Sequence, residues 1–242
     1  MVRLIAEGES ASVVAGATSA AAINGLERGK SDPGFAYVIF LLAHTTLAAR
    51  DADFAGRMAS LGVELPEEPG LFDLTSGFAA AVRKWHTEGK IRQTDLGEMA
   101  ELAAVETLTR CIGDQCGGLF PNGDDIRDAA RHFSTRNGFS TLAHEFISRF
   151  TQRFLLYHLG RELPLHVGAN GRFADPKAQL QFTDDLEIHT REAAVIVKTF
   201  AGEWYDKNRF ETGITKSQAS GFAAHCLTKL GAELAKRGDR DG

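Results

Sequence analysis

Residues 139–173 read FSTLAHEFISRFTQRFLLYHLGRELPLHVGANGRF, and they contain the longest regular helical pattern in the chain. Apolar side chains recur there every three or four residues, as in an amphipathic helix with one buried face. Gly160 and Pro164 predict where the helix ends. We expect this helix to form the middle of the core. Its apolar stripe consists of Phe139, Leu142, Ala143, Phe146, Ile147, Phe150, Phe154 and Tyr157.

The same helix carries a row of charged side chains. Glu145, Arg149 and Arg153 are spaced four residues apart and therefore share one face of the helix. The first pair has the favourable order, with the glutamate before the arginine. Ser140 or Thr141 is suited to cap the start of the helix.

The rest of the chain shows the same kind of organisation. All six prolines fall between apolar-periodic segments, where they punctuate helices. Two segments, 111–125 and 163–176, are too rich in Gly, Asn and Pro to be helical. No βαβ rhythm or repeat is present. The sequence therefore predicts an all-α fold, a single compact domain of about nine helices with two Gly/Pro-rich loops.

The expected domain has two flanking segments. Residues 1–32 are rich in Ala, Gly and Ser and predict an N-terminal arm or a closely packed helix, and residues 33–238 form the all-helical domain. Within it, Thr183 is expected to cap a helix that runs to about Asp206, and Thr215 to cap a last helix that ends at Gly238. Residues 239–242 are expected to be a disordered tail.

Composition places the chain among ordinary globular proteins. It has 242 residues, of which 43% are hydrophobic and 24% charged. Cys111, Cys116 and Cys226 form no disulfide framework, which favours a reducing cytoplasm. The N-terminus lacks the basic and apolar regions of a signal peptide. The most apolar stretch, 35–43, is too short to cross a bilayer, so no membrane association is expected.

The net charge of -5 is distributed unevenly. Residues 61–125 carry five basic and twelve acidic side chains, whereas residues 126–172 carry seven basic and three acidic ones. Every basic residue of the second block is an arginine, whose planar fork suits carboxylates and phosphates. These arginines either form ion pairs on the helix surfaces or bind an acidic partner or a nucleic acid.

Familiar catalytic signatures are incomplete. Ser148 stands where a zinc-protease helix beginning at His144-Glu145 needs its second histidine. No Glu-x-x-His pair and no Gly-x-Ser-x-Gly segment occurs in the sequence. His189 and Glu192 are three residues apart and can face one way as an acid–base pair, although acidic residues near a helix start are also favoured by its dipole. We predict no metal and no cofactor.

One constellation remains as a candidate binding site. Histidines and arginines flank the Gly-rich loop after the central helix, where they could hold an anion or a phosphate backbone. The arginines could equally pair with the acidic block 61–125 inside the fold. The candidate anion- or nucleic-acid-binding residues are Arg149, Arg153, His158, His166 and Arg172.

These observations favour a non-catalytic helical interaction subunit of a larger cytoplasmic protein assembly, with a protein as its partner. The alternative is a nucleic-acid- or phosphate-binding helical module that uses the arginine-lined helix and the following loop. A second alternative is a metal-dependent enzyme centred on His189 and Glu192 or on His144 and Glu145.

Overall fold

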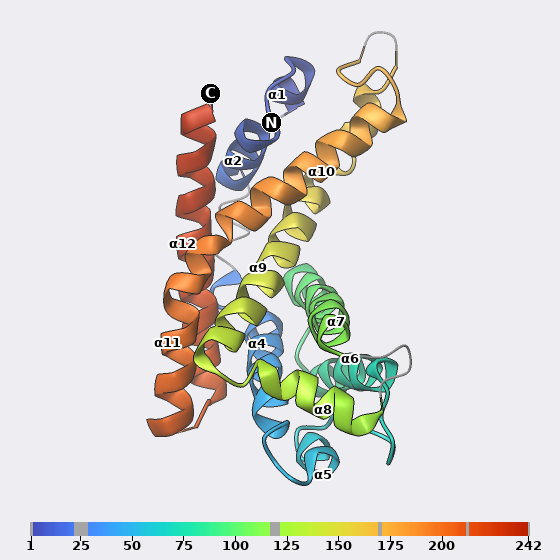
Figure 1. Cartoon of the computed structure of the whole chain (residues 1–242). Helices are drawn as coiled ribbons and strands as arrows, with labels where there is room; N and C mark the ends of the chain where they lie inside the picture. Colours follow the sequence, from blue (N-terminus) through green and yellow to red (C-terminus); the bar gives the residue numbers. More distant parts are fainter. Residues whose placement is uncertain (1, 22–28, 117–121, 169–170, 212, 242) are drawn as a thin grey trace.

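The predicted central helix is α9, Arg136–Leu159, and the other helices pack around it (Figure 1). The computed structural model describes residues 2–21, 29–116, 122–168, 171–211 and 213–241. In these ranges the chain forms eleven α-helices and one 3₁₀ turn, with no strand; a single isolated bridge joins Val167 and Phe173. The all-α prediction is confirmed. Outside the described residues lie 22–28 of the expected arm, 117–121 and 169–170 of the two expected loops, and Gly242 of the expected tail.

The buried face of α9 follows the predicted stripe except at its end. All the predicted stripe residues from Phe139 to Phe154 are buried, whereas the Tyr157 side chain is 57% exposed. The helix begins earlier than Ser140 or Thr141, because the Thr135 hydroxyl accepts a hydrogen bond from the Gly138 amide at 3.0 Å and caps it. Tyr157 is exposed because the last turns of α9 emerge beside the start of α7 and line a cleft there.

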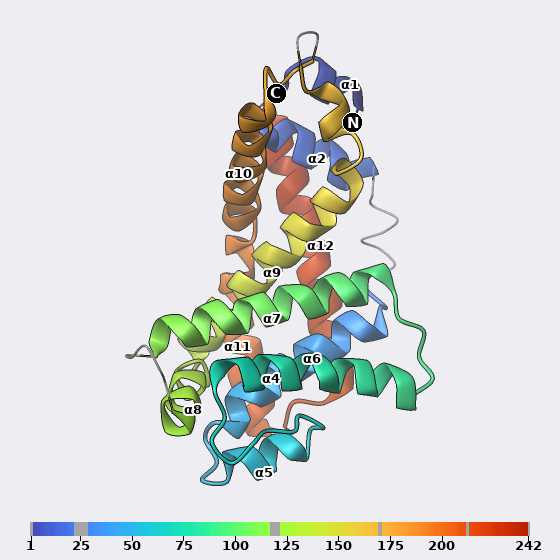
Figure 2. The same ribbon diagram turned by 90° about the vertical axis from the view of Figure 1, so that its right-hand side faces the viewer.

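The lower half of the molecule in Figure 1 is built by consecutive helices. α4 is an apolar helix buried on most sides, and it packs against α6, α7 and α8. α7 crosses α9 in Figure 2, and the two helices are in extensive contact. The helices of this half are α4 (Pro33–Ala48), α5 (Phe54–Ala59), α6 (Leu71–Glu88), α7 (Asp95–Gln115) and α8 (Gly123–His132).

The upper half brings the two ends of the chain together. α2 packs along α12 and also touches α10, so the small side chains of the N-terminal segment permit close helix packing. Long helices α9 and α12 continue into the lower half, where α11 packs against α9. The helices of the upper half are α1 (Val2–Ala6), α2 (Ala11–Ala21) and α10 (Pro176–Ala193). α11 (Val195–Glu211) lies in the lower half, and α12 (Lys216–Asp241) spans both halves.

Several helix boundaries differ from expectation. α10 begins at Pro176, where Asp175 accepts a hydrogen bond from the Ala178 amide, and not at Thr183. The helix expected to run to Asp206 is two helices, because the chain turns at Ala194. α12 runs to Asp241, past Gly238 and into the expected disordered tail. A glycine weakens a helix but does not oblige it to end.

Among the helices of the described ranges, none combines the length and the apolar character needed to cross a membrane.

Candidate functional site

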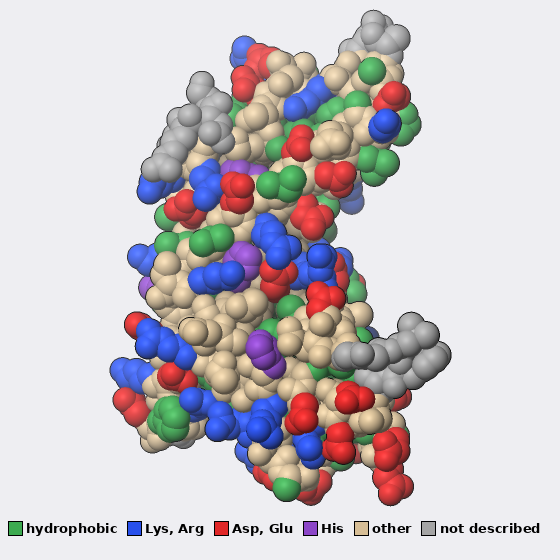
Figure 3. Space-filling view, viewed as in Figure 1, with side chains coloured by type: hydrophobic (Ala, Val, Ile, Leu, Met, Phe, Trp, Pro, Cys, Tyr) green, Lys and Arg blue, Asp and Glu red, His purple; other side chains and the backbone are tan. Residues whose placement is uncertain are grey.

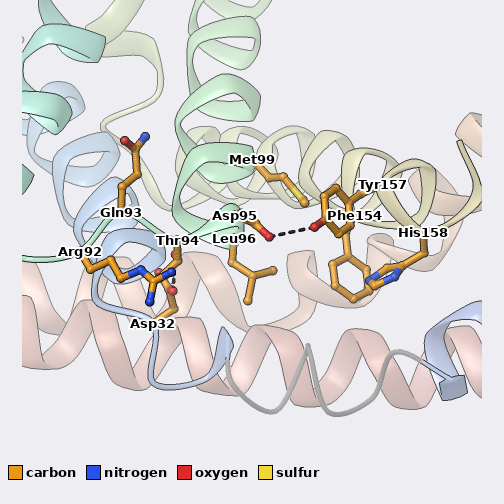
Figure 4. Close-up of a pocket in the computed structure, with 10 residues that line it drawn as sticks. All are labelled: Asp32, Arg92, Gln93, Thr94, Asp95, Leu96, Met99, Phe154, Tyr157 and His158. Carbon is orange, nitrogen blue, oxygen red and sulfur yellow. Dashed lines mark hydrogen bonds between the residues drawn. The ribbon is translucent and has the colours of Figure 1, made fainter. Parts of the chain in front are cut away.

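A cleft of about 490 Å³ opens where the start of α7 meets the end of α9 (Figure 4). Four segments contribute to it: the cap of α4, the loop between α6 and α7, the first turns of α7 and the last turns of α9. Its volume lies in the usual range of ligand-binding pockets. The lining residues are Asp32, Arg92, Gln93, Thr94, Asp95, Leu96, Met99, Phe154, Tyr157 and His158.

The cleft has an apolar interior and a polar rim. Leu96, Met99 and Phe154 supply the apolar surface. The Tyr157 hydroxyl donates a hydrogen bond to Asp95 Oδ2 at 2.9 Å, and this bond to a nearby carboxylate raises the pKa of Tyr157 (Figure 4). Tyr157 therefore stays neutral at physiological pH, with its hydroxyl hydrogen-bonded to Asp95.

His158 is also uncharged at physiological pH. Its ring packs edge-on against Phe154 with the ring centres 4.9 Å apart, and partial burial lowers its pKa. A neutral imidazole can donate or accept a hydrogen bond but carries no charge to attract an anion. Arg92 supplies the positive charge of the lining, beside Asp32 and Thr94 (Figure 4).

One wall of the cleft is a junction of two helix starts. Asp32 caps α4 by accepting the Phe35 amide at 2.7 Å, and its other oxygen accepts the Thr94 hydroxyl at 2.6 Å. Thr94 in turn caps α7 by accepting the Gly97 amide at 2.9 Å. The two caps are thus hydrogen-bonded to each other. Each cap stabilises its helix by about 1 kcal/mol, and their connection fixes the two helices in one orientation.

The predicted arginines Arg149 and Arg153 are held in ion pairs. Acidic and basic side chains are also interspersed over the face of the molecule in Figure 3. Both approach Glu106 of α7, Arg149 with Nε at 3.4 Å and Arg153 with Nη2 at 2.8 Å. Arg149 Nη1 also donates to Glu145 Oε2 at 2.8 Å, as the helical spacing predicts. Glu106 belongs to the acidic block 61–125, so these two arginines pair with that block inside the fold.

Glu145 is the centre of this ionic cluster. It is buried, and its second oxygen accepts Arg191 Nη2 of α10 at 2.5 Å. The neighbouring His144 and the two arginines lower the pKa of Glu145 to about 2. His144 Nε2 lies 2.9 Å from the Arg191 carbonyl oxygen, which further ties α9 to α10.

The other two predicted site residues lie at the far end of the molecule from α8. His166 ends the 3₁₀ turn Leu163–His166, and its carbonyl oxygen accepts the Phe173 amide at 2.9 Å. The Arg172 guanidinium lies over the Phe182 ring, 4.4 Å from its centre, and donates to the Glu9 carbonyl oxygen. The structure therefore brings Arg149 and Arg153 together at Glu106, and His166 and Arg172 near one loop. His158 alone lines the cleft.

The alternative His/Glu pairs have structural partners. Glu192 accepts a hydrogen bond from Arg237 Nη1 at 2.9 Å, and His189 is buried on α10.

Burial raises the pKa of the Cys111 thiol to about 11 and that of Cys226 well above its ordinary value. Within the part of the chain that the structure describes, no three His, Cys, Asp or Glu side chains are grouped to hold a metal ion.

Most of the cleft was not predicted from the sequence. Nothing in residues 92–99 indicates that α9 will end beside them. The one local signal was Tyr157, a residue with a polar tip at the end of an otherwise apolar stripe.

Comparisons with protein-family models, curated proteins and solved structures found no match to this chain.

Proposed function

We propose that this protein is a non-catalytic helical interaction subunit of a cytoplasmic protein assembly, and that the cleft between α7 and α9 binds its protein partner. The observation that carries the proposal is the exposed Tyr157 side chain, fixed by Asp95 at the edge of an apolar cleft. Tyr, Met and Arg are enriched in protein interfaces, and a rigid aromatic at a pocket has little entropy to lose on binding.

The cleft favours a partner segment that presents one large apolar side chain beside an acidic group. The apolar group would cover Leu96, Met99 and Phe154, which are the apolar side chains of the lining. Arg92 lines one end of the cleft, and Arg161 lies near enough to Tyr157 for its charge to offset part of the rise in the Tyr157 pKa. Both guanidinium groups can pair with carboxylates that flank the inserted side chain.

Comparative capture from cells that make the protein tests this proposal. Tagged wild-type protein and the Met99→Arg variant are used as baits after nuclease treatment, and captured proteins are quantified by mass spectrometry. Arg has a helix propensity similar to that of Met, so α7 is preserved while a charge enters the cleft. We expect at least one partner that wild type retains and Met99→Arg loses by about tenfold or more, as for an interface hot spot.

Phe72→Arg is the matched control. Phe72 lies on α6, its side chain is 79% exposed, and it is not part of the cleft lining. The control must retain the same partner. Equal capture by wild type and Met99→Arg would show that the cleft is not the interface.

The second candidate, a nucleic-acid- or phosphate-binding module, rests on the charge of the ionic cluster. Three arginines, Arg149, Arg153 and Arg191, face two glutamates, and the Arg153 and Arg191 side chains are 36% and 48% exposed. Arg149 is a poor test position, because its loss would leave buried Glu145 without one of its partners.

Arg153→Gln tests this candidate. Nucleic-acid binding requires affinity that falls steeply with salt and a shallower salt slope in the variant. Lys207→Gln on α11, outside the cluster, is the control for a general loss of positive charge. Unchanged affinity between low and high salt would reject this candidate.

A further inference from the structure

A second hollow, of about 450 Å³, lies between α11 and α12, and we call it the α11–α12 groove. The two helices follow each other in the chain and pack together in the lower part of the molecule (Figure 1). No residue that lines this groove also lines the cleft between α7 and α9. The volume of the groove falls in the range of small-molecule sites.

Aromatic rings form much of the groove. Phe222 of α12 is 4% exposed, and its ring stacks on that of Trp204 of α11 with the ring centres 4.3 Å apart. Phe200 meets Phe222 at 5.8 Å and His225 edge-on at 4.5 Å. Phe200 and Trp204 are half-buried, so parts of their rings remain uncovered. A planar aromatic ligand binds such a surface by offset stacking and edge-on contacts, in addition to the burial of its area.

Gly221 leaves the groove open above α12. It belongs to the lining and directly precedes Phe222. A Cβ atom added to Gly221 would have no neighbour within 4 Å. The groove therefore reaches the backbone of α12 at this position, and a larger side chain there would fill it.

The two charged residues of the lining differ in their pairing. Glu203 accepts a hydrogen bond from Arg136 Nη2 at 2.6 Å, so an arginine offsets its charge. Lys207 is exposed and has no carboxylate within ion-pair distance among the residues that the structure describes. The amide of Asn208 donates to the Trp204 carbonyl oxygen at 2.6 Å and is thus held against its own helix. The lining therefore offers an unpaired ammonium group beside uncovered rings.

From these features we infer that the α11–α12 groove binds a small planar aromatic carboxylate. The ring of the ligand packs against Phe200 and Trp204, and its carboxylate pairs with the Lys207 ammonium group. A single unpaired cation suits one carboxylate, whereas a nucleic acid requires several cations along its backbone. The inference goes beyond the proposed function, because partner binding in the α7–α9 cleft does not depend on it.

Isothermal titration calorimetry with 2-naphthoate at pH 7 and low salt tests this inference. We expect wild-type protein to bind it with a dissociation constant below about 1 mM. The uncharged 2-naphthamide has the same rings but forms no ion pair, so it should bind at least about threefold more weakly. Decalin-2-carboxylate keeps the carboxylate but has saturated, non-planar rings, and it should also bind at least about threefold more weakly.

Gly221→Leu fills the groove and preserves the helix. Leucine has a higher helix propensity than glycine, and its side chain enters open space, so the melting temperature should not fall. Binding of 2-naphthoate should weaken by about tenfold or more, because the leucine side chain occupies the ligand position. Thr228→Leu is the matched control. It is an exposed position about two turns further along α12 and outside the lining, and it should bind as wild type does.

Lys207→Gln isolates the ion pair. It should weaken 2-naphthoate binding at least about threefold and leave 2-naphthamide binding unchanged. Lys229→Gln, an exposed lysine of α12 outside the lining, should change neither. Met99→Arg, which alters the partner cleft, should leave 2-naphthoate binding unchanged and so show that the ligand is not in that cleft.

Each of four results would overturn the inference. The first is no binding of 2-naphthoate to wild-type protein at up to about 1 mM. The second is equal binding by wild type and Gly221→Leu, and the third is equal affinity of wild type for 2-naphthoate and 2-naphthamide. The fourth is loss of 2-naphthoate binding in Met99→Arg, which would place the ligand in the partner cleft.

Discussion

Glu145 is the residue on which three helices depend. It joins Arg149 of its own helix to Arg191 of α10, and Arg149 reaches Glu106 of α7. Burying a carboxylate is costly, and its partners must offset that cost through hydrogen bonds and charge. Because the partners come from different helices, the cluster fixes how α7, α9 and α10 are arranged.

The replacement Glu145→Gln should reduce the free energy of unfolding by about 3 kcal/mol at pH 7, since it leaves Arg149 and Arg191 without their anion. The folded-state pKa of about 2 lies below the ordinary value of 4.5, so the ionised carboxylate stabilises the fold above pH 4.5. That contribution is lost as the pH falls from 4.5 toward 2. The cost of the replacement should therefore shrink by about 1 kcal/mol between pH 7 and pH 3.5.

Urea unfolding of both proteins at the two pH values measures this difference. Ser140→Ala, which removes an exposed hydrogen bond from the same helix to the backbone carbonyl oxygen of Lys198, is the control and should cost the same at both. A cost of Glu145→Gln that does not depend on pH would contradict the assignment of Glu145 as the ionised centre of the cluster.

At the residue scale the sequence predicted contacts within a helix and missed those between helices. The Glu145–Arg149 pair follows from a spacing of four residues. The partners Glu106 and Arg191 lie far away in the sequence, and only the packing of α7 and α10 on α9 brings them close. Tyr157 was placed on the buried stripe because periodicity gives a direction around the helix but does not say where the covering helix begins.

At the scale of helices, α11 and α9 pack closely at Gly202. A Cβ atom added there would lie 2.7 Å from the Arg136 carbonyl oxygen, which is a backbone atom and cannot move without shifting α9. Gly221 of α12 is the opposite case, because an added Cβ atom would have no neighbour within 4 Å.

Replacing each of these glycines with alanine separates helix propensity from packing. Gly221→Ala should raise the free energy of unfolding by about 0.5 to 1 kcal/mol, the usual gain in a helix interior. Gly202→Ala has the same gain in propensity but should lower stability by about 1 to 2 kcal/mol because of overpacking. Chemical denaturation measures both changes. A stabilised Gly202→Ala variant would mean that α11 packs less closely against α9 than described.

The positions of helices were more predictable than their ends. Apolar periodicity predicted α9, since it must bury one face, and the last helix expected from Thr215 corresponds to α12. The ends were less accurate because several residues can serve as a cap, and tertiary contacts choose among them. Thr135 caps α9 although Ser140 and Thr141 are equally suitable by type. Asp32 caps α4 and Thr94 caps α7, and the hydrogen bond between them depends on the packing of α4 against α7.

At the scale of the whole molecule, the two halves meet along α9, and the proposed partner cleft lies on that helix. The partner cleft uses the last turns of α9, which belong to the upper half, and the start of α7, which belongs to the lower half.

Site-specific photo-cross-linking tests the central claim, that the α7–α9 cleft contacts a protein partner. A photoreactive residue is placed at Gln93, an exposed rim position of the cleft, or at Phe72 on α6 as the control. After irradiation in cells, we predict a cross-linked protein from position 93 that is absent from position 72 and is lost when Met99→Arg is added. Cross-linking to the same proteins from both positions, or a product at 93 that persists with Met99→Arg, would contradict the account.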